Sequence, residues 1–174
     1  NLARLERRHP KSLHQLASLV VMGGAVNTPG NVTPYAEFNF YSDPVAAQEV
    51  LSTGVLLTLV DLGACRRVSI TREDAENLKC GQPLGKLVVQ LLHNWFEHDQ
   101  TRDSFEYYDP LTLAAAIDPS ILQTREVALS VETVAADRLG ESRVLAEGGP
   151  VAVVEGVDRQ RFFDSLPGLL GLES

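Results

Sequence analysis

Apolar runs and amphipathic segments alternate along the chain, and this alternation indicates its secondary structure. Short apolar runs at 19–22, 55–60 and 151–154 have the length and composition of buried strands. A wide apolar stripe over 87–96 predicts a helix, and an apolar-spaced segment predicts a final helix over 159–170. Strands that alternate with helices are typical of an α/β fold, which is the fold class that we expect.

Turn-forming and capping residues between these segments predict the remaining boundaries. Thr71 and Asp74 form a capping box, so we expect a helix from there to about residue 79. Alternating polar and apolar residues over 126–133 indicate a half-buried strand, which a glycine-centred turn follows. Polar or glycine-containing stretches predict a loop over 61–67, a turn over 83–85 and a loop over 97–108.

The stretch over 19–47 combines such signals with the densest group of polar side chains. Gly23 and Gly24 end the first apolar run, and turn-forming residues over 27–31 predict a loop after it. Alternation then predicts an extended segment over 35–41 with one polar face and one aromatic face. The polar face would carry Glu37, Asn39 and Tyr41, and the aromatic face Phe38 and Phe40.

Asp43 and Pro44 mark the next boundary, because Asp at the N-cap and Pro at the first helical position are a specific helix-start signal. A carboxylate and two amides at a strand-to-helix junction can hydrogen-bond a polyol such as ribose. The same side chains have a simpler interpretation, in which Asn31 and Asn39 satisfy turns and Glu37 is a solvated charge. Residue chemistry alone leaves both interpretations open.

Composition narrows the classes of function. The 174 residues are 44% hydrophobic and 22% charged, which suits one folded unit over 1–174. A net charge of -8 argues against a nucleic-acid partner, which would require a basic stripe. The longest uncharged apolar run, 16–26, is too short to span a bilayer, so we expect no membrane partner. Cys65 and Cys80 are expected to be free thiols in a reducing, cytoplasmic compartment.

Two motifs carry a resemblance to a known family. Residues 22–25 read M-G-G-A, and residues 30–47 read G-N-V-T-P-x-A-E-F-N-x-x-x-D-P-x-A-A. A second piece joins Asp109-Pro110-Leu111 to an alanine-rich stretch over 114–119. Both resemble signatures of the inosine-uridine-preferring nucleoside hydrolases, which hydrolyse the N-glycosidic bond of ribonucleosides with a bound calcium ion. The resemblance implies an open, mostly parallel sheet flanked by helices, a ribonucleoside substrate, Ca²⁺ as cofactor, a role in nucleoside salvage and a homo-oligomer.

The resemblance also implies roles for individual residues. Asp109 would bind calcium and a ribose hydroxyl, although its place before Pro110 also suits a helix cap. Tyr108 occupies the position where the family usually has a histidine that protonates or orients the leaving base. A phenol titrates near ~10 and is a poorer proton donor at neutral pH than an imidazole. Met22 would line the sugar pocket, and the residues implied to hold the ribose are Asn31, Glu37 and Asn39.

The start of the chain fits the same family. Asn1-Leu2-Ala3 matches the end of a G-P-L-T-N-L-A stretch that precedes the M-G-G strand in the family. The aspartate cluster that supplies most calcium ligands would then lie upstream. We therefore expect 1–174 to be the C-terminal portion of a single domain, with little activity alone. The alternatives are a catalytically inactive sugar-binding or assembly subunit derived from this family and a hydrolase of another N-riboside.

Overall fold

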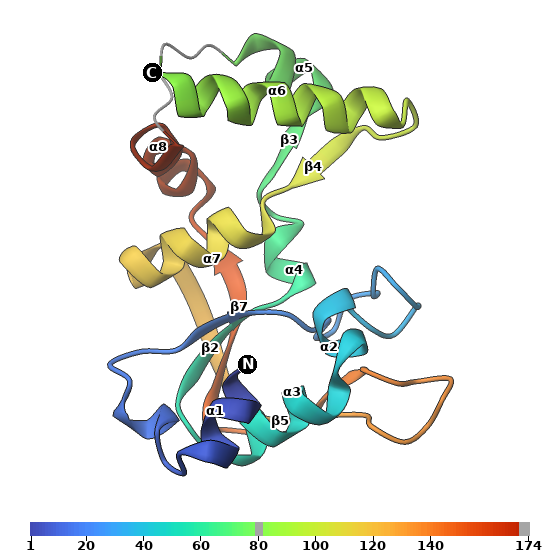
Figure 1. Cartoon of the computed structure of the whole chain (residues 1–174), viewed down its shortest axis with the longest axis vertical. Helices are drawn as coiled ribbons and strands as arrows, with labels where there is room; N and C mark the ends of the chain where they lie inside the picture. Colours follow the sequence, from blue (N-terminus) through green and yellow to red (C-terminus); the bar gives the residue numbers. More distant parts are fainter. Residues whose placement is uncertain (79–81, 171–174) are drawn as a thin grey trace.

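A computed structural model describes residues 1–78 and 82–170, and a five-stranded sheet forms its centre (Figure 1). The strands are β1 (Val20–Met22), β2 (Leu57–Val60), β5 (Leu122–Val131), β6 (Ser142–Glu147) and β7 (Val151–Val157). Their order is β1-β2-β7-β5-β6. β1 and β7 each pair in parallel with β2, whereas β5 is antiparallel to both β7 and β6. The α/β fold class is confirmed, and the described sheet is mixed.

Helices cover both faces of the sheet, because successive side chains of a strand point to opposite faces. Leu57 and Leu59 of β2 enter the core on one face, and Val60 enters the core on the other. The first face carries α1 (Leu2–Arg8) and α3 (Pro44–Ser52). The second face carries α4 (Leu62–Cys65), α7 (Tyr108–Ile117) and α8 (Arg159–Leu170). Short elements complete this part: η1 (Leu13–Gln15), α2 (Phe38–Ser42) and η2 (Pro119–Ile121).

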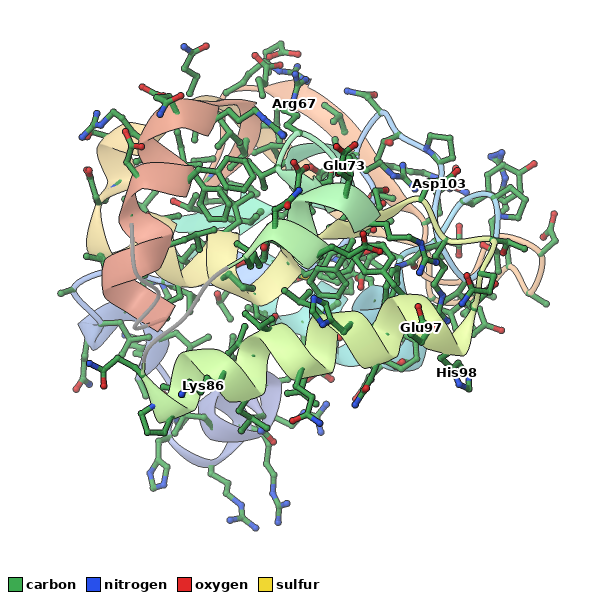
Figure 2. The ribbon with its side chains drawn as sticks, turned by 90° about the horizontal axis from the view of Figure 1, so that it is seen from above. Arg67, Glu73, Lys86, Glu97, His98 and Asp103 are labelled. Carbon is green, nitrogen blue, oxygen red and sulfur yellow. The ribbon has the colours of Figure 1, made fainter. Side chains whose placement is uncertain are left out.

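A smaller unit lies beyond the second face (Figure 1). It contains the antiparallel pair β3 (Ser69–Thr71) and β4 (Ser104–Glu106), together with α5 (Arg72–Asn77) and α6 (Pro83–His98). Figure 2 shows Lys86 near the start of α6 and Glu97 and His98 near its end, and all three side chains are exposed. The far side of this unit therefore faces solvent.

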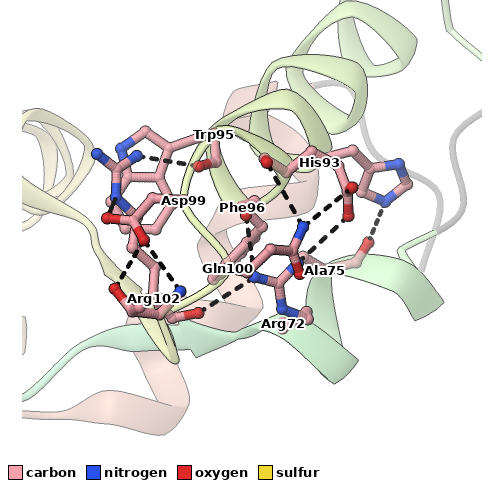
Figure 3. A network of polar contacts seen from close by, with 10 residues as sticks. Arg72, Ala75, His93, Trp95, Phe96, Asp99, Gln100 and Arg102 are labelled. Carbon is pink, nitrogen blue, oxygen red and sulfur yellow. Dashed lines mark hydrogen bonds and ion pairs between the residues drawn. The ribbon is translucent and has the colours of Figure 1, made fainter.

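Two arginines hold the smaller unit together (Figure 3). Arg72 donates to the Phe96 carbonyl oxygen at 2.9 Å, which ties α5 to the end of α6. Arg102 donates to the Trp95 carbonyl oxygen at 2.9 Å and lies over the Trp95 ring. The His93 ring nitrogen lies 2.9 Å from a backbone oxygen of α5, so this histidine serves the packing of α6.

The expectation of an extended segment over 35–41 was wrong. The chain turns into α2 at Phe38, and the Glu37 side chain accepts hydrogen bonds from the Asn39 and Phe40 backbone N–H groups. A helix rotates by ~100° per residue, so Phe38 and Phe40 no longer share a face. Phe40 is buried, whereas Phe38 is 61% exposed. Because Glu37 caps α2, this segment is helical although its short alternating pattern is typical of a strand.

The signals for helix starts had mixed outcomes. Asp43 caps α3 by accepting from the Ala46 N–H at 3.0 Å, as expected. The capping box of Thr71 and Asp74 is confirmed, as is the final helix. Asp109 does not cap α7: it lies in the first helical turn, because the helix already begins at Tyr108.

Three expected loops contain regular structure. The polar stretch over 61–67 contains α4, because Asp61 supplies a helix cap. Pro83 opens α6 as its first residue, so 83–85 is a helical turn. The stretch over 97–108 contains β4, which pairs with β3.

Two other expectations concern cysteines and membranes. Cys65 is a free thiol buried in the core, whereas Cys80 lies outside the described residues. Within the described ranges, no helix is long and apolar enough to cross a membrane.

The packing of β2 predicts a sharp difference between two nearby leucines. Leu59 is 0% exposed and Leu56 is 78% exposed. Leu59→Ala should lower the free energy of unfolding by about 2–5 kcal/mol, because it leaves a cavity in the core. Leu56→Ala, the matched control, should change it by less than about 0.5 kcal/mol. Urea unfolding followed by circular dichroism measures both, and equal losses would contradict this description of the core.

Candidate functional site

The candidate site begins where β1 ends at Met22. The Gly23 N–H donates to the Val60 oxygen at 3.2 Å and continues the pairing with β2. A Cβ on Gly23 would lie 2.7 Å from the Phe40 ring, so glycine permits α2 to pack closely against the end of the strand. The parallel strands β1 and β2 therefore end side by side, at the edge of the sheet where open α/β folds bind ligands.

Glu37 joins the start of α2 to the end of β1. Its Oε1 accepts from the Asn39 N–H at 2.8 Å, and its Oε2 accepts from the N–H groups of Phe40 at 3.1 Å and Gly24 at 2.9 Å. Glu37 is only 2% exposed, so the interpretation as a solvated surface charge was wrong. Three backbone donors compensate for the burial of its carboxylate.

Asn31 precedes Glu37 in the chain and Asn39 follows it, and both asparagines are exposed. The Asn39 Nδ2 lies 3.2 Å from the Met22 sulfur and 3.5 Å from the Met22 carbonyl oxygen, which places the amide against the end of β1. The Asn31 Oδ1 accepts from the Phe38 N–H at 3.0 Å. The structural interpretation therefore holds for the Asn31 oxygen, while each amide keeps polar atoms that can face a ligand.

A cavity of about 230 Å³ lies beside Met22 and Asn39, between the sheet and the helices α1 and α3. Apolar side chains of Val21, Leu57 and Leu59 line much of it. Neither Asn31, Glu37 nor Asp109 lines this cavity. The structure thus brings Met22 and Asn39 to one hollow, while hydrogen bonds tie Glu37 to Gly24 and Asn31 to Phe38.

Tyr108 and Asp109 lie in the first turn of α7, which packs against β1. The Tyr108 hydroxyl donates to the Glu106 carboxylate at 3.1 Å. Burial, followed by the charge of Glu106, raises the pKa of Tyr108 to about 12. The phenol therefore stays protonated at neutral pH and can act there as a hydrogen-bond donor.

The charges of several carboxylates act on one buried thiol, that of Cys65. Burial raises the pKa of Cys65 to about 12, and the charges of Asp61, Glu37, Asp109 and Glu106 raise it in that order. Each of these carboxylates is therefore within electrostatic range of the same sulfur. The Cys65 thiol therefore stays protonated at neutral pH.

Few of the described side chains are candidates to bind a metal ion. Calcium in proteins takes ~6–8 oxygen ligands. Among the described residues, no group of three or more His, Cys, Asp or Glu side chains is arranged to hold a metal ion. The described side chains therefore do not by themselves supply the ligands of a calcium ion, and Asp109 offers one exposed carboxylate in the first turn of α7.

Sequence reasoning missed two polar residues of this region. Asp61 is 1% exposed, and its Oδ2 accepts from the Val26 N–H at 2.8 Å. Ser142 is 9% exposed, and its Oγ accepts from the Ala25 N–H at 3.3 Å. An aspartate after a buried strand is a helix-cap signal that could have identified Asp61. No local pattern distinguishes Ser142.

Comparisons with known proteins agree with this architecture. The model of the family described as inosine-uridine preferring nucleoside hydrolase matches residues 1–164. The pyrimidine-specific ribonucleoside hydrolase RihA of Salmonella newport (strain SL254) is 36% identical over 176 residues, which are 95% of this chain and 56% of that relative. The Escherichia coli O9:H4 (strain HS) protein of the same name is also 36% identical with the same coverage. The chain thus spans little more than half the length of these curated relatives.

Solved structures give the same result. A plant nucleoside hydrolase, the PpNRh1 enzyme, has a TM-score of 0.87 and 27% identity, and the match covers 97% of this chain and 58% of that one. An inosine-uridine preferring nucleoside hydrolase from Bacillus anthracis has a TM-score of 0.78 and 25% identity, with coverages of 97% and 56%. Because the family signature, the sheet and the matched length all agree, the chain belongs to the inosine-uridine preferring nucleoside hydrolase family.

Proposed function

We propose that this chain carries the ribose-holding part of a hydrolase that splits ribonucleosides into ribose and a free base. In this reaction the N-glycosidic bond breaks, the OH of water bonds to the anomeric carbon, and a proton of water goes to the base. The observation that carries the proposal is the junction of Met22, Glu37 and Asn39 at the end of β1, within a chain that matches the family over 1–164.

The chemistry of these side chains suits a sugar. In this proposal the Asn39 amide and the Asn31 Nδ2 contact ribose hydroxyls, which both donate and accept hydrogen bonds. The Glu37 Oε1 accepts from the Asn39 N–H and retains capacity for a second donor, such as a hydroxyl. Met22 offers an apolar surface to the sugar ring. Since backbone bonds already fix Glu37, these groups would need little reorganisation on binding.

Asp109 is proposed to contribute one carboxylate to a calcium site whose other ligands lie outside the described residues. The proposal for the domain is that 1–174 is the C-terminal portion of a single domain. Support comes from the relatives, of which the chain covers 56%, and from β1, which is an edge strand of the described sheet. Such an edge offers unpaired backbone groups to a further strand.

Tyr108 is proposed to face the leaving base as a hydrogen-bond donor. Its hydroxyl donates to Glu106 and would exchange this partner for the base. With a pKa of about 12, Tyr108 retains its proton at neutral pH, so the proton that the base takes up comes from water.

The setting of the protein is also part of the proposal. We place it in nucleoside salvage, in the cytoplasm and as a homo-oligomer. The buried free thiol of Cys65 suits a reducing compartment. Exposed apolar side chains on α6 suit an interface between copies: Leu84, Leu87 and Leu91.

A second candidate function is a catalytically inactive sugar-binding or assembly subunit. The absence of a metal-binding cluster among the described residues favours it, as does the low acidity of Tyr108. Hydrolysis of uridine and inosine by the full-length gene product, measured with Ca²⁺ and again with a chelator, decides between the two. Hydrolysis that the chelator abolishes supports the enzyme, and ribose binding without hydrolysis supports the subunit.

The contact between Asn39 and Met22 predicts a specific loss of affinity. Asn39→Ala should lower kcat/KM for ribonucleosides about tenfold, because one amide hydrogen bond to the sugar is lost. Asn77→Ala is the matched control, since Asn77 is an exposed asparagine whose side chain donates to the Glu73 carbonyl oxygen of α5. An unchanged kcat/KM in Asn39→Ala would remove Asn39 from the sugar site.

The raised pKa values of Tyr107 and Tyr108 predict a loss of stability in alkali. Both are about 12 in the folded chain, against a usual value of 10.0. An unfolded chain therefore releases these protons first as the pH rises, so the free energy of unfolding should fall between pH 10 and 12. Below pH 10 the stabilisation that comes from these two protonated tyrosines is fully present. Tyr108→Phe should remove part of the fall, because Tyr107 and the buried Cys65 thiol, whose pKa is also raised to about 12, contribute the rest. Urea unfolding at pH 8, 10 and 11 measures it, and equal slopes in wild type and Tyr108→Phe would refute the assignment.

A further inference from the structure

The buried polar side chains of the described part of the chain share one target. Glu37, Asp61 and Ser142 each accept a hydrogen bond from the backbone that follows β1. They come from three places: the start of α2, the junction of β2 with α4, and the start of β6. The bonds run from Gly24 N to Glu37 Oε2 (2.9 Å), from Ala25 N to Ser142 Oγ (3.3 Å) and from Val26 N to Asp61 Oδ2 (2.8 Å).

Asp61 uses its two oxygens for different segments. Oδ1 accepts from the Ala64 N–H at 3.0 Å and caps α4, while Oδ2 accepts from Val26, 35 residues earlier in the chain. Burial raises the pKa of Asp61 above its usual value, and the N–H groups of Ala64 and Val26 oppose that shift. A helix cap needs neither the second bond nor this burial. The second bond therefore indicates a role in holding the segment that contains Val26.

The other end of α4 holds the same segment. Arg66 follows the last residue of α4, and its Nη1 donates to Thr28 Oγ1 at 2.5 Å and to the Pro29 oxygen at 2.8 Å. One short helix therefore contacts the loop at Val26 through its N-cap and at Pro29 through its C-cap. We refer to α4 together with Asp61 and Arg66 as the α4 clamp.

The loop that the α4 clamp holds lies between two residues of the proposed ribose site. Met22 ends β1 two residues before Gly24, and Asn31 follows Gly30, whose oxygen lies 3.5 Å from an Arg66 nitrogen. Asn31 in turn bonds to the first residue of α2, next to Glu37. A shift of the loop would therefore move Asn31 relative to the end of β1.

We propose that Asp61 is a positioning residue of the ribose site: through the α4 clamp it fixes the 24–30 loop, and thereby the relative placement of Met22 and Asn31. This inference rests on the proposed function. Asp61 itself contacts no sugar and acts only through the loop. Its contribution is preorganisation of the polar groups that meet the substrate.

The test compares Asp61→Asn with wild type in the full-length gene product that contains residues 1–174. An asparagine keeps the size of the side chain but has only one acceptor oxygen, so it cannot satisfy both Ala64 and Val26. The KM for uridine should rise about tenfold while kcat changes by less than about threefold. The Val26 amide should exchange with deuterium at least about tenfold faster, whereas the Thr58 amide within the sheet should keep its rate.

Matched variants separate positioning from general stability. Asp74→Asn alters a capping carboxylate of α5 that accepts hydrogen bonds from Thr71, and it should leave the KM unchanged. Arg66→Gln removes the outer contact of the α4 clamp from an exposed position and should raise the KM about threefold even if Asp61→Asn folds poorly. Arg67, which Figure 2 labels, is the exposed neighbour of Arg66, and Arg67→Gln should leave the KM unchanged.

Each result supports or overturns the inference. A lower kcat at unchanged KM in Asp61→Asn would indicate only a smaller folded fraction and would overturn it, as would an unchanged KM in Arg66→Gln. Faster exchange of Val26 with unchanged KM would show that the loop does not serve the ribose site. If wild type hydrolyses no ribonucleoside, the proposed function fails first; if it does and the variants keep its KM, only this inference fails.

Discussion

The backbone N–H groups of Gly24, Ala25 and Val26, which follow β1, are buried, and each needs a hydrogen-bond acceptor. This requirement determines how the candidate site is arranged. A buried N–H without a partner costs about 1–3 kcal/mol, so these amides strongly favour one arrangement of the surrounding elements. Their acceptors are side chains of α2, of the β2–α4 junction and of β6. The sheet, the first helix after the loop and the β5–β6 hairpin therefore cannot shift independently.

This constraint also explains which parts of the fold could be predicted from the sequence. The strand around 55–60, the helix that Asp43 caps and the final helix follow from local patterns, and the structure has all three. Alternation over 35–41 misled, because seven residues fit a strand and a capped helix about equally well. The Glu37 carboxylate favours the helix, because it accepts from the Asn39 and Phe40 N–H groups of α2 as well as from Gly24.

The sequence likewise identified some residues of the candidate site and missed others. The family motif identified Met22, Asn31, Glu37 and Asn39, and the structure gathers these residues around the end of β1. It did not identify Asp61 or Ser142, whose loop partners lie 35 and 117 residues away in the chain. Such contacts leave no periodic trace in a sequence. The polar groups that support a site are therefore harder to predict than those that face its ligand.

We propose that ribose binds at the carboxyl end of β1, between the two asparagine amides. This placement can be measured by titrating the isotope-labelled full-length protein with uridine in the presence of Ca²⁺, with the side-chain amide signals of Asn31 and Asn39 as reporters. Both signals should shift and saturate together, while the signal of Asn77 on α5 should stay in place. Saturable binding that leaves the signals of Asn31 and Asn39 unmoved would contradict it.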